Sequence, residues 1–411
     1  MSTTTNISSA HPLRREVLLL LQVAMAVFVW TVVIGILNGT DIVDFNRKTV
    51  LSHVHAGTLG WITMCVFGAS LWLFGATANA TAVKYARVLT GAAIIAFPAF
   101  AFTFFLTYGN GRPIVGTFAL ATIVGFFLWV AWRARGVQLS VTHLGFLAAV
   151  ATSVAGGTIG LLLATRIATG REVIPSGAAD AHPGTMVIGF LIPVGMALSE
   201  WCFGWPTLKA ATRLGKWQIG LPFAGGLVLM VGLLFDIKPL APIAALLELA
   251  GVVIFVKRMW PALRAVDWLH GSTARFAAAA GIAIVANIVF INYLVARYEG
   301  DFDKVPTRHL LALDHMMFVG VLTNAIFGLL LGVTQKDTRG RVVTDAVFYG
   351  MNAGLIGFII SLLADATWLE QISTPVMGLS ILAALAVFTL RLRTSAAEGS
   401  LFVGSVADPA G

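Results

Sequence analysis

Twelve apolar runs, each about 20 residues long, constrain this chain more than any other feature. A helix of about 20 residues spans the roughly 30 Å hydrocarbon core of a bilayer. Loops with Gly, Pro and charged residues separate the runs, so they are predicted as helices and not as barrel strands. The runs lie near residues 16–38, 52–76, 84–108, 113–132, 141–166, 181–204, 217–235, 240–260, 274–297, 309–333, 345–366 and 373–392.

The composition agrees with a membrane protein. The 411 residues are 58% hydrophobic and 11% charged, and the mean hydropathy is +0.88. Soluble domains have a charged fraction of about 25%. The predicted fold is all-α and polytopic: an N-terminal tail (1–15), a twelve-helix membrane domain (16–393) and a C-terminal tail (394–411). The first tail has no apolar core, so it is expected to be a tail and not a signal peptide.

The cations predict the orientation of the twelve helices. Eighteen of the 27 Lys and Arg residues fall at the helix ends on the side of the N-terminus, and nine fall on the other side. Because cytoplasmic loops carry the excess of cations, both termini are expected in the cytoplasm and the protein in the cell (inner) membrane, among its lipids. The net charge of +8 is then this asymmetry, and no nucleic-acid partner is expected.

Five of the eight histidines gather where the second, sixth and tenth runs begin, which is near the outer face in this orientation. They are His53, His55, His182, His309 and His315. The other three are expected on the cytoplasmic side. Polar groups at membrane depth usually serve a function. The chain has no Cys-x-x-Cys-His sequence, which excludes covalent c-type haem attachment.

The spacing of these histidines suggests an internal repeat. His55 and His182 are 127 residues apart, and so are His182 and His309. The sequence "HAGTLGW" also echoes "HPGTMVIGF", and "DAHPGTM" echoes "LDHMMFV", although the second pairing uses His315 and a spacing of 133. The pattern predicts a pseudo-threefold arrangement of four-helix units, each donating ligands from its second helix.

His53 and His55 are two residues apart and therefore point about 200° apart on a regular helix. They cannot bind one small ion together, but one helix can serve a large planar cofactor on each flank. A haem iron held by neutral imidazole suits such a dry site between helices. The alternative interpretation is that these are interfacial histidines hydrogen-bonded to backbone or water.

Two stretches resemble a known superfamily. "HVHAGTLGW" (53–61) is similar to the pattern H-x-H-x-G-x-L-G-W of the cbb-type oxidases and related nitric oxide reductases, and "AHPGTMVIGFLIP" (181–193) is similar to their low-spin haem helix. With twelve helices, the chain resembles subunit I of the haem-copper oxidases, although the His-x-His helix comes second here and tenth there. In size it is also similar to the NnrS-like haem-copper membrane proteins.

This resemblance implies roles for individual residues. His55 and His182 become the axial ligands of a low-spin haem b, and His53 becomes the proximal ligand of a second, five-coordinate haem. Five arginines near the outer face could pair with haem propionates: Arg112, Arg166, Arg171, Arg297 and Arg308.

The ligands for a copper or non-haem iron site are less complete than those for the haems. The chain lacks the adjacent His-His pair of oxidase copper, which leaves His309 and His315, with Asp314 as a third ligand or as a group that orients His315. On a regular helix His309 and His315 point about 240° apart, so both reach one ion only if the helix is irregular after Pro306.

The leading functional expectation is a haem protein that binds or reduces a diatomic gas, NO rather than O2, or that transfers electrons near the outer face. Its partners would be the gas and an electron-donor protein or quinol. Whether it is an oxidoreductase stays open. The alternatives are a twelve-helix secondary transporter, which broken helices near the midplane would favour, and a non-catalytic module that holds haem for sensing or assembly.

The predicted orientation is testable with single cysteines. A cysteine placed in the loop between Arg297 and Arg308 should react with an impermeant thiol reagent added to intact cells, because the 18-to-9 division of cations puts this loop outside. Labelling only after the membrane is made permeable would contradict this orientation.

Overall fold

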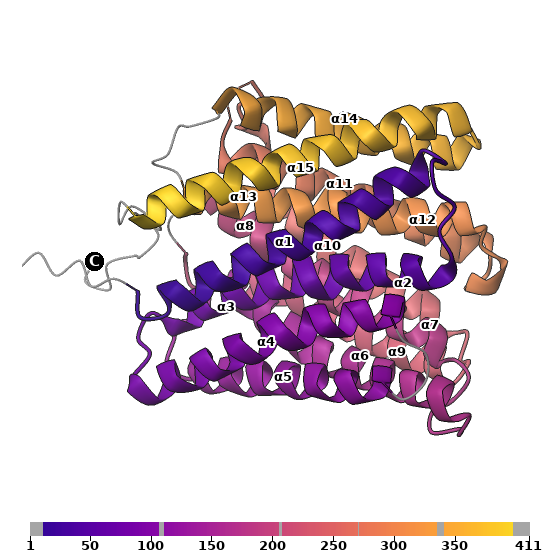
Figure 1. Ribbon diagram of the computed structural model, residues 1–411, viewed down its shortest axis with the longest axis horizontal. Helices are drawn as coiled ribbons and strands as arrows, with labels where there is room; N and C mark the ends of the chain where they lie inside the picture. Colours follow the sequence, from indigo (N-terminus) through magenta and orange to yellow (C-terminus); the bar gives the residue numbers. More distant parts are fainter. Residues whose placement is uncertain (1–10, 107–110, 205–207, 270, 335–340, 398–411) are drawn as a thin grey trace, which may run out of the picture.

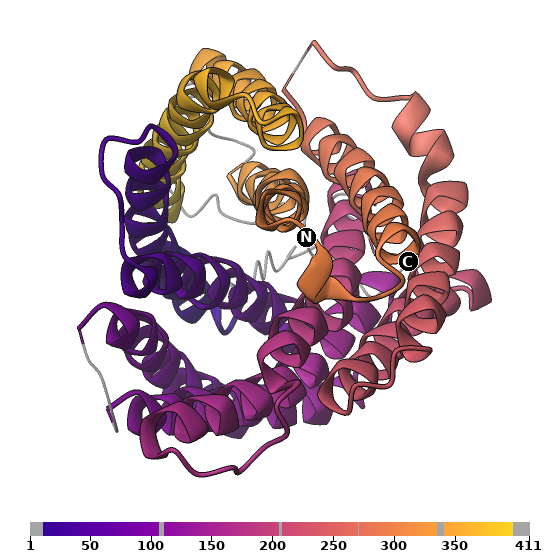
Figure 2. The same cartoon turned by 90° about the vertical axis from the view of Figure 1, so that its right-hand side faces the viewer.

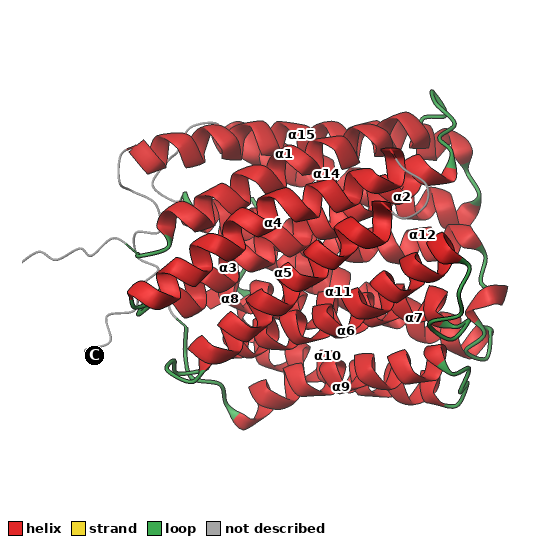
Figure 3. Ribbon diagram, turned by 60° about the horizontal axis from the view of Figure 1, so that its bottom comes forward, coloured by secondary structure: helices red, strands yellow, loops and turns green. Residues whose placement is uncertain are grey.

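Lipid offers no hydrogen bonds to a backbone, so each segment that crosses it has to satisfy its own, and this chain does so with helices. The computed structural model describes residues 11–106, 111–204, 208–269, 271–334 and 341–397. Figure 3 shows these residues as helices joined by loops. The elements are α1 (Arg14–Gly39), α2 (Arg47–His55), η1 (Ala56–Thr63), α3 (Met64–Gly75), α4 (Ala80–Leu106), α5 (Gly111–Ala134), α6 (Val141–Thr169), α7 (Ala178–Thr185), η2 (Met186–Leu191), α8 (Ile192–Gly204), α9 (Arg213–Leu234), α10 (Leu240–Arg264), α11 (Thr273–Arg297), η3 (Phe302–Lys304), α12 (Thr307–His315), η4 (Met316–Thr323), α13 (Asn324–Val333), α14 (Arg341–Ala364) and α15 (Thr367–Ala397).

The predicted twelve-helix fold is confirmed. Twelve helices in the described residues are long and apolar enough to cross a membrane, and three of them join two α-helices through a π-helix. Their ends differ from the predicted ends by a few residues. The second begins at Arg47 and not at residue 52, because the Asn46 side chain caps it by accepting a hydrogen bond from the Thr49 N–H at 3.1 Å. The last one continues through Ala397, beyond its predicted end at 392.

Three helices form the centre of the bundle: α2–η1–α3, α7–η2–α8 and α12–η4–α13. In the most apolar windows of these three spans, 78% to 89% of the residues are buried, compared with 33% to 56% in the other nine. Figure 2 looks along the bundle and shows α12 and α13 enclosed by other helices. The surrounding helices expose large apolar side chains, as a surface facing lipid requires, for example Ile95 on α4 and Phe118 on α5.

Each central helix changes from α to π geometry close to a histidine. The π-helix η1 begins directly after His55, η4 begins directly after His315, and η2 begins at Met186, four residues after His182. Such π segments are rare and are frequent at functional sites. This shared break supports the pseudo-threefold repeat. It also makes His315 the structural equivalent of His55, so the equal spacing of 127 residues, which ends at His309, does not follow the repeat.

The histidine-bearing elements lie together at one end of the bundle. Figure 1 shows α2, α7 and α12 on the right, whereas α1 begins and α15 ends on the left. The described chain therefore enters and leaves the bundle at the end opposite the histidines, as an even number of spans requires.

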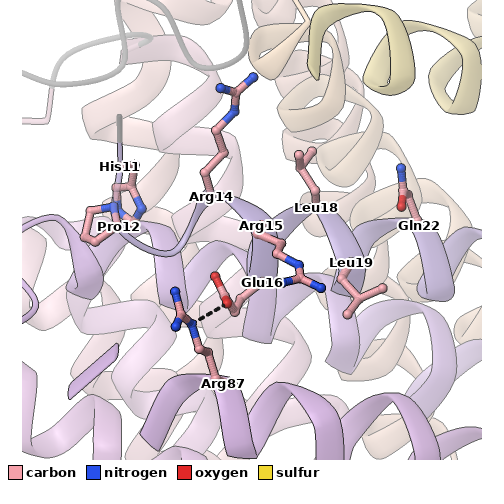
Figure 4. A pocket seen from close by; sticks show the side chains of 9 residues that line it. All are labelled: His11, Pro12, Arg14, Arg15, Glu16, Leu18, Leu19, Gln22 and Arg87. Atoms are coloured by element: carbon pink, nitrogen blue, oxygen red, sulfur yellow. Dashed lines mark hydrogen bonds and ion pairs between the residues drawn. The ribbon is translucent and has the colours of Figure 1, made fainter. Parts of the chain in front are cut away.

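A second feature lies at that opposite end. A cavity of about 530 Å³ opens beside the start of α1, and His11, Arg14, Arg15, Glu16 and Arg87 are among the side chains that line it (Figure 4). Arg87 pairs with Glu16 at 3.0 Å. The His11 ring stacks on Trp72, with 4.0 Å between ring centroids, and a ring nitrogen bonds to the Trp72 carbonyl. Burial lowers the pKa of His11 from 6.5 to about 4.

This pKa shift predicts a pH-dependent stability. Between pH 6.5 and about 4 the unfolded chain binds a proton at His11 that the folded chain does not, so stability falls as the pH falls through this window. Thermal unfolding in detergent should show a smaller loss of stability from pH 7 to pH 5 in His11→Gln than in the wild type. Equal slopes in the two proteins would contradict this role of His11.

Candidate functional site

A mostly apolar cavity of about 420 Å³ lies between the central helices and α4, α5 and α6. This volume is within the range of about 300–1,000 Å³ that is usual for cofactor and ligand pockets. Its walls include Phe100, Phe104, Leu161, Phe190 and Phe318, and the polar or charged groups that line it include His55, His182, Arg47, Arg112 and Asp314. It is therefore an apolar chamber with two imidazoles on its walls.

His55 and His182 face one another across this chamber. Their ring centroids are 6.4 Å apart and their planes differ by only 10°. This separation is too large for contact between the rings, so it leaves room for another atom. The His55 ring also stacks on Phe104, with 4.0 Å between centroids and an angle of 17°. The stacking fixes the orientation of His55.

Hydrogen bonds determine which nitrogen of each ring can bind a ligand. Nδ1 of His55 lies 2.8 Å from the Leu51 carbonyl oxygen, and Nδ1 of His182 lies 2.8 Å from that of Gly156. A carbonyl oxygen only accepts, so each Nδ1 carries the proton and donates it. Each Nε2 then holds a lone pair and makes no hydrogen bond to a described residue. This is the tautomer in which histidine binds metals, with its other nitrogen oriented by the protein.

The sequence "GGTIG" (156–160) on α6 explains the position of His182. The Gly156 carbonyl accepts the Nδ1 proton, and a methyl group on Gly160, one turn later, would lie 2.8 Å from Cε1 of His182. A side chain on Gly156 would overlap the sulfur of Met186. Only glycine lets α6 approach the ring so closely. The cluster of three glycines within five residues of α6 is the feature of the sequence that indicates this close approach.

His53 and His55 point to different neighbours, as predicted. Nδ1 of His53 donates to the Thr31 carbonyl of α1 at 2.8 Å, whereas His55 faces α4 and α7. His315 donates from Nδ1 to the Leu311 carbonyl at 2.8 Å and packs edge-on against Phe358 of α14. Neither Nε2 has a hydrogen bond to a described residue, so these two rings have the same free nitrogen as His55 and His182.

Two other histidines use both ring nitrogens. His11 accepts from the Leu13 N–H and bonds to the Trp72 carbonyl. His143 lies 2.8 Å from the Ser140 hydroxyl, with which it forms a capping box for α6, and its Nε2 bonds to the Leu73 carbonyl. These rings have no nitrogen left for a metal. His270 lies outside the described residues.

The structure does not bring His309, Asp314 and His315 together. Residues Thr307–His315 form one regular helix, so the irregularity that the shared site needs after Pro306 does not occur. His309 faces Phe290 of α11, Asp314 lines the cavity of His55 and His182, and His315 faces Phe358 of α14. Over the described parts of the chain, no three His, Cys, Asp or Glu side chains are grouped so that they could hold a metal ion.

Of the five arginines suggested for cofactor carboxylates, Arg112 lines the cavity, with its guanidinium 4.3 Å from the Phe104 ring centroid. Arg47, which is not among these five, lines it too. Arg308 instead pairs with Asp365 at 3.1 Å and with Glu370 at 2.8 Å. Arg166 donates to the Pro175 carbonyl.

The close approach of α6 to His182 predicts a difference between two glycine substitutions. Gly160→Ala should destabilise the folded protein by about 1–3 kcal/mol, because its methyl group overlaps the His182 ring. The control Gly220→Ala, where no atom lies within 4 Å of the added methyl group, should leave stability unchanged or raise it by up to about 1 kcal/mol through helix propensity. Thermal unfolding in detergent measures both, and equal effects would contradict the packing argument.

Comparison with known proteins finds no family model that matches this chain, and no curated protein matches it either.

Proposed function

We propose that this is an integral membrane haem protein in which His55 and His182 are the two axial ligands of a haem b, and that it transfers single electrons at the end of the bundle that carries the histidines. The observation that carries the proposal is the separation of the two parallel imidazoles, 6.4 Å between centroids.

The separation agrees with ligation on opposite sides of one metal. A bond from imidazole nitrogen to a metal is about 2.0 Å, and the ring centroid lies about 1.1 Å behind that nitrogen, so two opposed imidazoles have centroids about 6.2 Å apart. Two imidazoles at a tetrahedral angle would be only about 5 Å apart. The 6.4 Å between the two ring centroids favours the opposed arrangement.

Two protein ligands suit a haem better than a bare ion. A structural zinc site needs four protein ligands, and a catalytic one needs three. The described residues offer no group of three. A haem brings four nitrogens of its own and needs only the two axial positions filled. Arg112 and Arg47 at the cavity supply cations for its two carboxylates.

The surroundings of the two imidazoles favour electron transfer over reaction with substrate. When bound, the haem supplies an iron that accepts and returns one electron. His55 and His182 would hold the haem from both sides, so the site would offer no open position to a gas. The apolar wall, with Phe100 and Phe104, excludes water and influences the reduction potential. A quinol or a redox protein is the expected donor.

The geometry of the central helices supports a secondary transporter less well than a haem protein. Substrate sites of many secondary transporters are made by helices that unwind near the membrane midplane. The three central spans here change between α and π geometry without an unwound residue between them. The three central spans therefore lack the unwound segments from which such transporters build their substrate sites.

The proposal predicts a coloured protein. Detergent-purified wild type should show the visible spectrum of low-spin haem b, oxidised and dithionite-reduced, and a pyridine haemochrome. His55→Ala and His182→Ala should each convert this haem to a high-spin form or lose it, because one axial ligand is missing. His309→Ala is the control, since this ring faces Phe290 and not the cavity.

A colourless preparation from haem-sufficient cells would overturn the proposal. Unchanged low-spin bands in both His55→Ala and His182→Ala would overturn the assignment of the ligands. Rapid oxidation of a quinol or cytochrome by O2 in the pure protein would show a catalytic role in place of electron transfer alone.

A further inference from the structure

The cavity beside the start of α1 is separate from the cavity of the two imidazoles, because α1 begins at the end of the bundle opposite the histidines (Figure 1). It has a volume of about 530 Å³, and its lining side chains are drawn in Figure 4. Three of them are the arginines Arg14, Arg15 and Arg87, and one is the carboxylate of Glu16. The lining therefore has an excess of positive charge, which favours an anion.

Helices α1, α4 and α15 supply or hold these arginines. Nε of Arg87, on α4, donates to Oε1 of Glu16 at 3.0 Å, and the Arg87 side chain is 63% exposed. Arg14 donates from Nη2 to the Ser395 carbonyl of α15 at 3.4 Å. Arg15 is exposed and forms no hydrogen bond or ion pair with a described residue. Arg15 and Arg87 therefore keep N–H donors for a ligand, and a guanidinium group matches the oxygens of a phosphate.

Glu16 offers an acceptor inside this cationic lining. Its side chain is 7% exposed, and its Oε1 accepts the hydrogen bond from Arg87 (Figure 4). Its Oε2 is buried and has no hydrogen-bond partner among the described residues. A buried carboxylate oxygen without a partner is costly, and a carboxylate can only accept. The cavity therefore fits a ligand that brings an anionic group for the arginines and a hydrogen-bond donor for Oε2.

The position of the cavity favours a lipid as the source of this ligand. The first span of the chain begins at Arg14, so Arg14 and Arg15 lie where the apolar segment starts, at the level of the lipid headgroups. Leu18 and Leu19, one turn further into the span, line the same cavity. A headgroup can thus reach the arginines while its acyl chain follows the apolar side chains of α1.

The charges of the lining select the kind of headgroup. The arginines favour a negatively charged phosphodiester. An ammonium headgroup would donate to Oε2, but Glu16 already pairs with Arg87, so the ammonium would add a positive charge beside the guanidinium groups. A hydroxyl headgroup donates without bringing a charge. The lining therefore favours a phosphodiester that carries a hydroxyl group.

We propose that this cavity binds the headgroup of an anionic phospholipid of the phosphatidylglycerol type, with its phosphate on Arg15 and Arg87 and a headgroup hydroxyl on Oε2 of Glu16. The first turn of α1 has no side-chain cap and adds a partial positive charge beside the phosphate. The site goes beyond the proposed function and does not depend on haem, so the two are tested separately.

The test is native mass spectrometry of the delipidated, detergent-purified protein, titrated with short-chain phosphatidylglycerol. Arg15→Gln and Arg87→Gln should each weaken the binding of the first lipid about fivefold, the effect of one cation beside a lipid headgroup. Arg135→Gln is the matched control, because Arg135 is exposed and does not line the cavity, and it should bind as the wild type does. Equal affinity in all four proteins would overturn the site.

A second lipid tests the role of Glu16. Phosphatidylmethanol has the same phosphodiester and the same charge but no hydroxyl group, so the wild type should bind it about tenfold more weakly, since a hydrogen bond to a charged group is lost. Glu16→Gln should reduce this preference, because a neutral amide oxygen is a weaker acceptor than a carboxylate. Equal affinity of the wild type for the two lipids would overturn the contact with Glu16.

Two soluble compounds separate a lipid site from a site for free phosphates. Glycerophosphoglycerol is the same headgroup without acyl chains, and it should not displace phosphatidylglycerol at an equal concentration, because it lacks the contact with Leu18 and Leu19. Inorganic phosphate should behave in the same way. Displacement of the lipid by either compound at an equal concentration would overturn the assignment to a lipid.

Discussion

Nine membrane-spanning helices enclose the three central helices, whose first turns carry the histidines. The rest of this structure depends on that enclosure. Histidines at membrane depth are costly in contact with lipid and are tolerated inside a bundle. The spans that carry His53, His55, His182 and His315 are accordingly the most buried of the twelve. The outer helices face the lipid, so their exposed surfaces need only apolar side chains. The division between central and outer helices thus determines where chemistry can take place.

Within that centre, hydrogen bonds to main-chain carbonyls orient the imidazoles. The carbonyls of Leu51 and Leu311 lie in the same helix as their rings, and those of Thr31 and Gly156 lie in the preceding helix. A carbonyl acceptor selects one tautomer and leaves the opposite nitrogen free. The π-helices coincide with these positions. A π turn inserts a residue into the helix, so it shifts the side chains that follow relative to those that precede.

The three π-helices begin at equivalent places in the three central spans, but only two of these spans carry a histidine directly before the π-helix. His55 and His315 directly precede η1 and η4, whereas Thr185 directly precedes η2 and His182 lies three residues before Thr185. His309 lies farther from the π-helix of its span, and its ring faces Phe290 of α11.

The sequence by itself determined the class of protein, because runs of about 20 apolar residues can only satisfy their backbone in lipid as helices. It also determined that His53 and His55 face opposite flanks, since that follows from helix geometry alone, and it predicted His55 and His182 as partners through resemblance. The surroundings of each ring were decided by tertiary structure. Hydropathy does not say which helices are neighbours, so it could not link the carbonyl of Thr31 to His53, or the carbonyl of Gly156 to His182. Equal spacing pointed to His309, yet the π-helix that begins at Met316 makes His315 the equivalent residue. Register and helix contacts, which depend on packing across the whole bundle, decided that His55 and His182 lie together.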